Sequence, residues 1–168
     1  NTDPLHELKH KGNARYLCFT DQDIKSKTWE IVQVNPTDKP NTESRRYKCL
    51  PHLFFGNVPT IWVDACLDCY FDPDELLGKY QGKITNFSHP DRTRISQEAE
   101  AIIKWGKAQE SEIKNQLADY KKDGFDTDEN PMKDLSNNGF ILRRDCKELN
   151  RLWWHEVKTK TRRDQMSL

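Results

Sequence analysis

The chain has 168 residues, with 27 basic and 27 acidic side chains and a formal net charge of zero. Balanced charge excludes a global field that would draw the chain to nucleic acid or to an anionic membrane, so no nucleic-acid-binding surface is expected. The mean hydropathy of −0.97 is polar, but an aromatic content of 10%, with five tryptophans, argues against disorder. The length fits one domain over residues 1–168, and no apolar run is long enough to span a membrane.

The cysteine content points to a reducing environment. The odd number of five cysteines suits reduced thiols, which favours a cytoplasmic location, as does the absence of a signal or membrane segment. Cys66 and Cys69 form a single C-x-x-C, and without a second pair at zinc-ligand spacing we interpret both as ordinary thiols. The first residue is not Met, so the chain is expected to be a fragment.

The first half of the chain predicts three strands and one helix. Residues 1–13 are polar and predict a loop, and residues 15–20 and 28–34 predict strands. A helix is expected over residues 42–50, with Thr42 as its cap. Residues 60–64 form an unbroken apolar strand that ends in Asp64, which indicates burial on both faces, as in a parallel sheet.

The second half alternates helices and strands. Asp72 followed by Pro73 is typical of a helix start. Residues 84–87 predict a strand, residues 96–122 one long helix capped by Ser96, and residues 139–142 another strand. A final helix is expected to begin at Asp145. This order predicts an α/β domain with a mostly parallel sheet covered by helices on both faces.

In such a sheet, ligands bind at the carboxyl ends of the strands. The residues expected at those ends are Thr20, Asp21, Asp64 and His89, with Arg143 and Arg144.

Asp64 is the leading candidate for a site residue. A carboxylate directly after three large apolar residues lies where the sheet opens, and Asp68 follows closely. Gathered carboxylates suit Mn²⁺ or Mg²⁺, which prefer oxygen ligands and bridge phosphates. The alternative is that Asp64 only ends a strand. For Asp72 and Asp74 the role of capping the next helix is favoured.

Two pairs of basic residues suit anionic or hydroxyl-bearing ligands. Arg45 and Lys48 are three residues apart, share one helix face and suit a pyrophosphate; the alternative is a solvated helix face. His89 and Arg92 follow the strand at 84–87 and suit a metal or a substrate hydroxyl; the alternative is an ordinary loop.

Two later segments suit a sugar. Asn138 and Gly139 precede a strand, where an amide reads hydroxyls and Gly permits close approach; the alternative is a plain turn. Asp164, followed by Gln165, suits a base or a hydroxyl ligand; the alternative is a charged helix terminus.

The order of short motifs along the chain is more specific than any one of them. In sequence these are Phe19-Thr20-Asp21, Trp29-Glu30-Ile31, Arg45-Arg46-Tyr47-Lys48-Cys49-Leu50-Pro51-His52, Ile61-Trp62-Val63-Asp64, Asp72-Pro73-Asp74-Glu75-Leu76, His89-Pro90-Asp91-Arg92, Glu98-Ala99, Gly139-Phe140-Ile141-Leu142-Arg143-Arg144, Trp153-Trp154 and Arg163-Asp164-Gln165. From about Tyr16 to Ser167 the chain resembles the glycosyltransferase-like domain family that includes plant mucilage-related and turgor-regulation proteins.

The resemblance implies a GT-A-like, Rossmann-like fold that binds a nucleotide-sugar donor and a hydroxyl-bearing acceptor. It implies that Asp64 takes the first position of a D-x-D motif, with Mn²⁺ or Mg²⁺ held by Asp64 and Asp68. Thr20, Asp21, Arg45 and Lys48 would lie near the nucleotide. Asn138, Gly139, His89 and Arg92 would bind substrate, and Asp164 and Gln165 would face donor or acceptor as catalytic residues.

The sequence departs from that pattern at two places. Cys66 stands at the third D-x-D position, and a thiolate is a poor ligand for manganese or magnesium. The first strand of a GT-A fold is expected to be missing, because residues 1–13 do not resemble it.

Three functions follow from these observations. The leading prediction is a nucleotide-sugar-dependent glycosyltransferase. A degenerate, non-catalytic nucleotide- or sugar-binding module is the first alternative, favoured by Cys66 and by the fragment character. A metal-dependent hydrolase of lipid amides is the second, which the five histidines do not favour because none has metal-ligand spacing.

Overall fold

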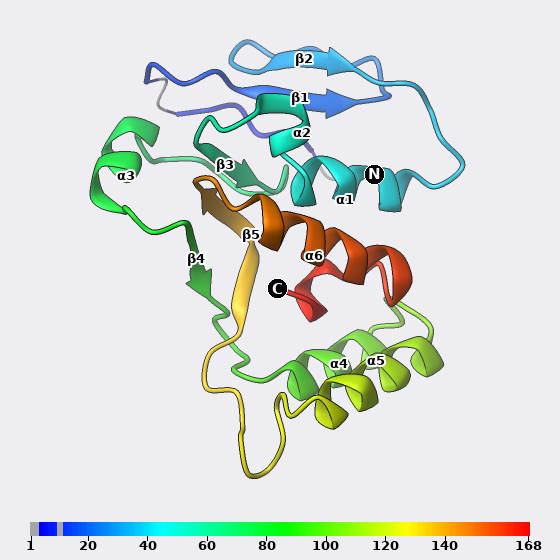
Figure 1. Ribbon diagram of the computed structural model, residues 1–168. Helices are drawn as coiled ribbons and strands as arrows, with labels where there is room; N and C mark the ends of the chain where they lie inside the picture. The colour runs from blue at the N-terminus through cyan, green and yellow to red at the C-terminus, as the bar shows by residue number, and fades with distance from the viewer. Residues whose placement is uncertain (1–3, 10–11) are drawn as a thin grey trace.

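The computed structural model describes residues 4–9 and 12–168 of the chain. Within them, two separate sheets form (Figure 1). The smaller sheet pairs β1 (Leu17–Thr20) with β2 (Glu30–Gln33) in parallel. The larger sheet has the order β3-β5-β4, from β3 (Thr60–Val63), β5 (Ser136–Arg143) and β4 (Ile84–Ser88). The helices are α1 (Pro40–Cys49), α2 (His52–Phe55), α3 (Pro73–Lys79), α4 (Ile95–Lys104), α5 (Glu110–Lys122), α6 (Lys147–Thr159) and the 3-10 helix η1 (Asp164–Met166).

The expected mixture of helices and strands is confirmed, but the prediction of a mostly parallel sheet is wrong for the larger sheet. Its central strand β5 runs antiparallel to both β3 and β4. An apolar run does not encode strand direction, and the expected burial of this strand on both faces is also corrected, because all four residues of β3 are only partly buried. Because β5 runs antiparallel to both, β3 and β4 end at the same edge of the sheet at which β5 begins.

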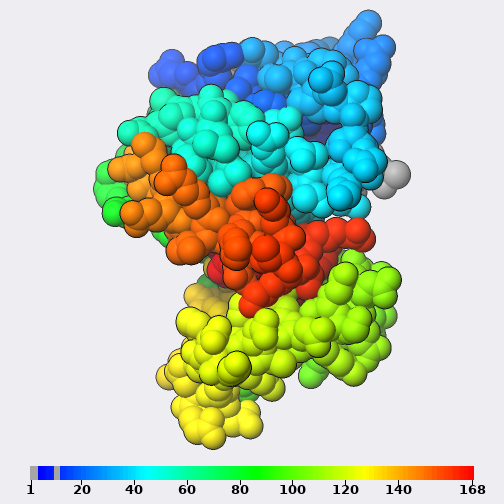
Figure 2. All heavy atoms as spheres, turned by 45° about the vertical axis from the view of Figure 1, so that its right-hand side comes forward, coloured from blue at the N-terminus to red at the C-terminus, as the bar shows by residue number. Residues whose placement is uncertain are grey.

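Two apolar clusters hold the chain together. In the first, α1 and α6 pack on β5 through Cys49, Leu50, Ile141, Trp153 and Val157. In the second, Ala99, Ile102, Ile113 and Met166 join the α4–α5 hairpin to η1. The C-terminal segment therefore lies between the clusters, as Figure 1 shows. In the space-filling view of Figure 2, α6 lies between the N-terminal part and the α4–α5 lobe.

The helix expected over residues 96–122 is two helices, α4 and α5. Gly106 lies between them with φ of +60°, a conformation that ends an α-helix and that Gly adopts without strain. Ser96 lies inside α4, whose cap is Arg94.

The other predicted caps have mixed outcomes. The cap of α3 is confirmed, because the Asp72 carboxylate accepts a hydrogen bond from the amide of Asp74 at 2.8 Å. The helix predicted from Thr42 begins earlier, after Lys39. The final helix begins after Cys146 and not at Asp145, which has φ of +32°.

The N-terminal segment and the small sheet pack together. Of the polar residues 1–13, residues 1–3, 10 and 11 lie outside the described part, and the others form neither helix nor strand. Glu7 accepts hydrogen bonds from the amides of Lys27 and Thr28, which fixes the approach to β2. Phe19 of β1 stacks on Tyr47 of α1 with ring centroids 4.5 Å apart, which joins the small sheet to α1.

No helix within residues 4–9 and 12–168 has the length and apolar character needed to cross a membrane.

Candidate active site

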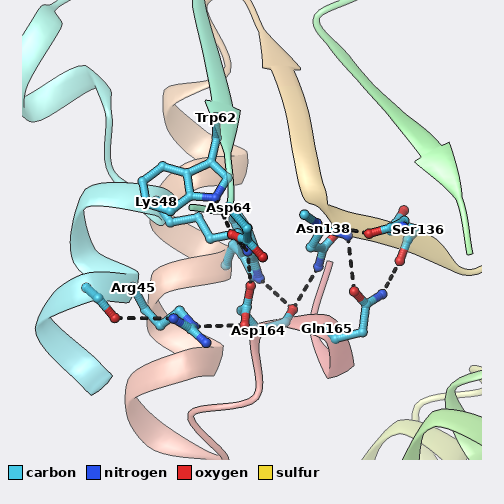
Figure 3. Close-up of polar contacts among 12 residues, drawn as sticks. Arg45, Lys48, Trp62, Asp64, Ser136, Asn138, Asp164 and Gln165 are labelled. Carbon is cyan, nitrogen blue, oxygen red and sulfur yellow. Dashed lines mark hydrogen bonds and ion pairs between the residues drawn. The ribbon is translucent and has the colours of Figure 1, made fainter. Parts of the chain in front are cut away.

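Two cations and two carboxylates meet beside the common edge of β3 and β5 (Figure 3). The ammonium of Lys48 lies 3.2 Å from Oδ1 of Asp64 and 2.6 Å from Oδ2 of Asp164. Nε of Arg45 lies 2.8 Å from Oδ1 of Asp164. The structure thus brings together four of the predicted site residues, from α1, the end of β3 and η1.

Local helix geometry explains why both cations point the same way. Arg45 and Lys48 are three residues apart on α1 and therefore share a face. The last turn of α1 is fixed by Arg143 of β5, whose Nη2 donates to the Lys48 carbonyl at 2.6 Å. The Lys48 side chain is only 3% exposed, whereas that of Arg45 is 28% exposed. Lys48 is therefore the inner charge of the site and Arg45 the outer one.

Asp64 is held at the end of β3 by backbone and side-chain contacts. Its amide donates to the Gly139 carbonyl at 2.8 Å. Its Oδ1 accepts from Nε1 of Trp62 at 2.7 Å, in addition to the Lys48 ammonium. Its Oδ2 has no hydrogen-bond partner among the described residues, and the side chain is 40% exposed. One oxygen of this carboxylate is engaged, and the other remains free for a ligand.

Gly139 lies close to that free oxygen. A Cβ at this position would lie 3.7 Å from Oδ2 of Asp64 and 3.3 Å from Cδ1 of Leu67. A Cβ would also lie 3.2 Å from Oδ1 of Asn137, so the absence of a side chain at Gly139 is required by the close packing of Asn137 and Leu67 beside the Asp64 carboxylate.

Asp164 is the buried anion that holds the two cations. Its side chain is 7% exposed, and each carboxylate oxygen is paired, one with Arg45 and one with Lys48. Burial by itself raises the pKa of this carboxyl, but the charges of Lys48 and Arg45 outweigh it and hold the pKa below its usual value. Asp164 is therefore ionised at neutral pH and is a weak base.

The main chain of η1 is tied to β5 and α6. The Asp164 carbonyl accepts from Nδ2 of Asn138 at 3.0 Å and from Nε1 of Trp153 at 3.1 Å. Gln165 accepts from the Asn138 amide through Oε1 at 3.1 Å and donates to the Ser136 carbonyl through Nε2. The Gln165 side chain thus hydrogen-bonds to the backbone of β5 as a neighbouring strand would. Asn138, which is 1% exposed, links β5 to η1.

A second cluster of polar side chains, His89, Arg92 and Glu98, lies between the end of β4 and α4. His89 follows β4, and its amide donates to the Leu135 carbonyl at 2.6 Å. Arg92 bonds both to Nε2 of His89 and, at 2.6 Å, to Oε2 of Glu98. Burial lowers the pKa of the Arg163 guanidinium, and the nearby charge of Glu98 partly offsets that lowering. His89 and Arg92 thus belong to a network next to η1.

Several predicted residues lie elsewhere. Thr20 lies at the end of β1 in the separate small sheet and Asp21 follows it, and in the described part of the chain neither shares a hydrogen bond or ion pair with the Lys48 cluster. Asp68 pairs with Nδ1 of His6 at 2.9 Å. Arg143 pairs with Thr60 at the opposite end of the sheet from Asp64, because β5 is antiparallel, so its expected place at the ligand edge is corrected.

The donor set at Asp64 does not fit a divalent cation. No three His, Cys, Asp or Glu side chains gather as metal ligands within residues 4–9 and 12–168. Asp64 offers a single free oxygen beside an ammonium, and Asp68 pairs with His6. Mg²⁺ is usually bound by one or two carboxylates together with water and substrate phosphates, and the ammonium of Lys48 next to the one free oxygen of Asp64 disfavours a cation there.

Residues 6–168 match the family model described as "TOD1/MUCI70, glycosyltransferase-like domain". The chain belongs to this family. The suspected resemblance is thereby confirmed, and the cluster of Arg45, Lys48, Asp64 and Asp164 lies inside the TOD1/MUCI70 glycosyltransferase-like domain. Neither the comparison with curated proteins nor that with solved structures gives a match.

Sequence reasoning missed Trp62 as a polar partner in the site. Trp62 and Asp64 are two residues apart, so on an extended segment both point to the same face. That spacing is the signal in the sequence, whereas the apolar run alone predicts only a strand residue at Trp62.

Proposed function

We propose that this domain transfers a sugar from a nucleotide-sugar donor to a hydroxyl-bearing acceptor. The strongest support is that two cations, Arg45 and Lys48, are both held by Asp164 beside the half-exposed carboxylate of Asp64. The chain also belongs to the glycosyltransferase-like family. Fixed cations suit a diphosphate, and a free carboxylate oxygen suits a sugar hydroxyl.

Arg45 is the residue proposed to contact the diphosphate. Its Nε is held by Asp164 and its Nη1 donates to Ser44 at 3.2 Å, which leaves Nη2 without a partner among the described residues. Negative charge grows on the diphosphate as the sugar leaves. A guanidinium fixed before the reaction stabilises that charge without reorganisation, which is the largest expected contribution to the rate.

Lys48 supports Arg45 through its field and its position. Its ammonium is buried and lies between the two carboxylates, so it neutralises Asp164 and orients Asp64. Asp164 then acts as the residue that positions both cations. Gln165 and Asn138 act with it by holding η1 against β5.

The sugar is proposed to lie beside Oδ2 of Asp64, because this side chain is 40% exposed and Oδ2 has no hydrogen-bond partner among the described residues. His89 and Arg92 are proposed to line the acceptor side, because their network reaches the η1 segment through Glu98 and Arg163. The identity of the acceptor hydroxyl is then decided by groups next to η1.

A second candidate function is binding of a nucleotide sugar without transfer. It is favoured by the engagement of both oxygens of Asp164, which leaves that carboxylate unsuited to accept a proton from an acceptor hydroxyl.

Thermal shift against UDP-glucose, UDP-galactose, GDP-mannose, UDP and GDP tests the proposal. A ligand that binds only the folded state raises the melting temperature by an amount that grows with the logarithm of its concentration relative to Kd. At least one nucleotide sugar is expected to stabilise the wild-type domain, and Arg45→Met is expected to abolish that shift. Lys158→Met, at an exposed position of α6, is the matched control. No shift with any of the five ligands contradicts the proposal, and a shift without sugar transfer favours the second candidate.

A further inference from the structure

The two oxygens of the Asp64 carboxylate have different environments. Oδ1 is saturated by the Lys48 ammonium and by the Trp62 indole N–H. Oδ2 lies near Gly139 and has no partner among the described residues, and the Asp64 side chain is 40% exposed. A ligand that binds this carboxylate can therefore contact only Oδ2, and the buried ammonium of Lys48 lies on the Oδ1 side of the same carboxylate.

A divalent cation and a hydroxyl group differ in how they suit this environment. A divalent cation needs several oxygen ligands and is repelled by the nearby ammonium. No group of three His, Cys, Asp or Glu side chains gathers as metal ligands in the described chain, and Asp68 is paired with His6. A hydroxyl needs one acceptor, and hydrogen bonds to a charged acceptor are about twice as strong as neutral ones.

The positive charge that a diphosphate requires is already present in the protein. Arg45 and Lys48 are fixed by Asp164, and Arg163 lies next to it along the chain. These three cations exceed the two carboxylates by one charge, so the cluster is suited to an anion without an added metal ion.

We infer that Asp64 accepts a hydroxyl of the donor's sugar ring through Oδ2, and that the domain binds its nucleotide sugar without a divalent cation. This inference rests on the proposed function. It assigns to Lys48 the place beside Asp64 that a metal ion would otherwise take.

Isothermal titration of the wild-type domain with UDP-glucose, UDP-galactose and GDP-mannose, in EDTA and in MnCl₂, tests metal independence. The affinity for the sugar that binds is expected to agree within about twofold between the two conditions. A loss of about tenfold or more in EDTA overturns the inference and leaves the proposed function intact. Binding of none of the three in either condition contradicts the proposed function itself.

Asp64→Ala separates a sugar contact from a metal contact. Loss of a hydrogen bond to a charged acceptor is expected to weaken binding of the nucleotide sugar by about tenfold or more, while binding of UDP or GDP is unchanged or tighter. A parallel loss for the free diphosphate in MnCl₂ overturns the inference, because it indicates a metal bridge to phosphate.

Mn²⁺ binding measured by electron paramagnetic resonance provides a direct control. Cys66 is exposed two residues after Asp64, so Cys66→Asp adds a second carboxylate at the turn. Cys66→Asp is expected to bind Mn²⁺ more tightly than the wild type by about tenfold or more. Measurable Mn²⁺ binding by the wild type, as tight as that of Cys66→Asp, overturns the inference.

Discussion

Removal of the buried ammonium is predicted to be the most damaging single change in the cluster. In Lys48→Met the new side chain fills a similar volume, but it leaves Oδ2 of Asp164 and Oδ1 of Asp64 without the cation that lies 2.6 Å and 3.2 Å away. The Lys48 and Asp164 side chains are 3% and 7% exposed, so water does not replace the lost charge.

The expected loss follows from burial. Breaking a buried ion pair by removing one partner costs about 3–5 kcal/mol of unfolding free energy. Arg45 still pairs with Oδ1 of Asp164, and Asp64 is 40% exposed, so the lower limit applies, about 3 kcal/mol at neutral pH.

The loss is also expected to depend on pH. The folded-state pKa of Asp164 is lowered, so its pairing stabilises the fold above the unfolded-state pKa and is lost as pH falls through the folded-state value. The difference between wild type and Lys48→Met is therefore expected to shrink below about pH 4.

Urea unfolding of both proteins at pH 7 and pH 3 measures this difference. Lys158→Met, at an exposed site, is expected to change the unfolding free energy by less than about 0.5 kcal/mol and serves as the control. A cost for Lys48→Met of less than about 1 kcal/mol at neutral pH, or one that grows on acidification, refutes the account of the buried pair.

Three further predictions concern single positions. Gly106→Ala is expected to lower the unfolding free energy by about 1 kcal/mol because φ is +60°, whereas Gly78→Ala in α3 is expected to raise it by about 0.5 kcal/mol; equal effects in urea unfolding would contradict the difference. Asp126→Asn is expected to cost about 2 kcal/mol because the buried carboxylate, 1% exposed, bonds Arg94, and thermal unfolding at neutral pH would show no change if that bond were unimportant. Trp62→Phe removes the indole donor to the Asp64 carboxylate and is expected to leave the fold intact by circular dichroism but to weaken nucleotide-sugar binding severalfold in calorimetry; unchanged affinity would show that the donor is dispensable.

The sequence predicted those parts of the site that depend on local periodicity. The placement of Asp64 at a strand end followed from the apolar run before it, and the shared face of Arg45 and Lys48 followed from their spacing. The proximity of Asp64 to Asn138 and Gly139 was implied only by the family resemblance. That η1 brings Asp164 under α1 is a long-range contact, and no local pattern encodes it.

Fold-level expectations failed where direction or a single backbone angle decides. The antiparallel course of β5 moved Arg143 to the edge of the sheet opposite Asp64. The left-handed conformation of Gly106 divided a segment whose apolar spacing is continuous enough for one helix. Neither feature alters which side chains are apolar, so neither is visible in a hydrophobic pattern.

Release of nucleoside diphosphate from a nucleotide sugar tests the central claim most directly. The wild-type domain with the nucleotide sugar that binds and a hydroxyl-bearing acceptor is expected to release the diphosphate as sugar is transferred. Arg45→Met is expected to lower the rate by about a hundredfold, because it removes the fixed positive charge that stabilises the leaving diphosphate. Release by Arg45→Met at the wild-type rate, or no release by the wild type with a donor that it binds, would contradict the account.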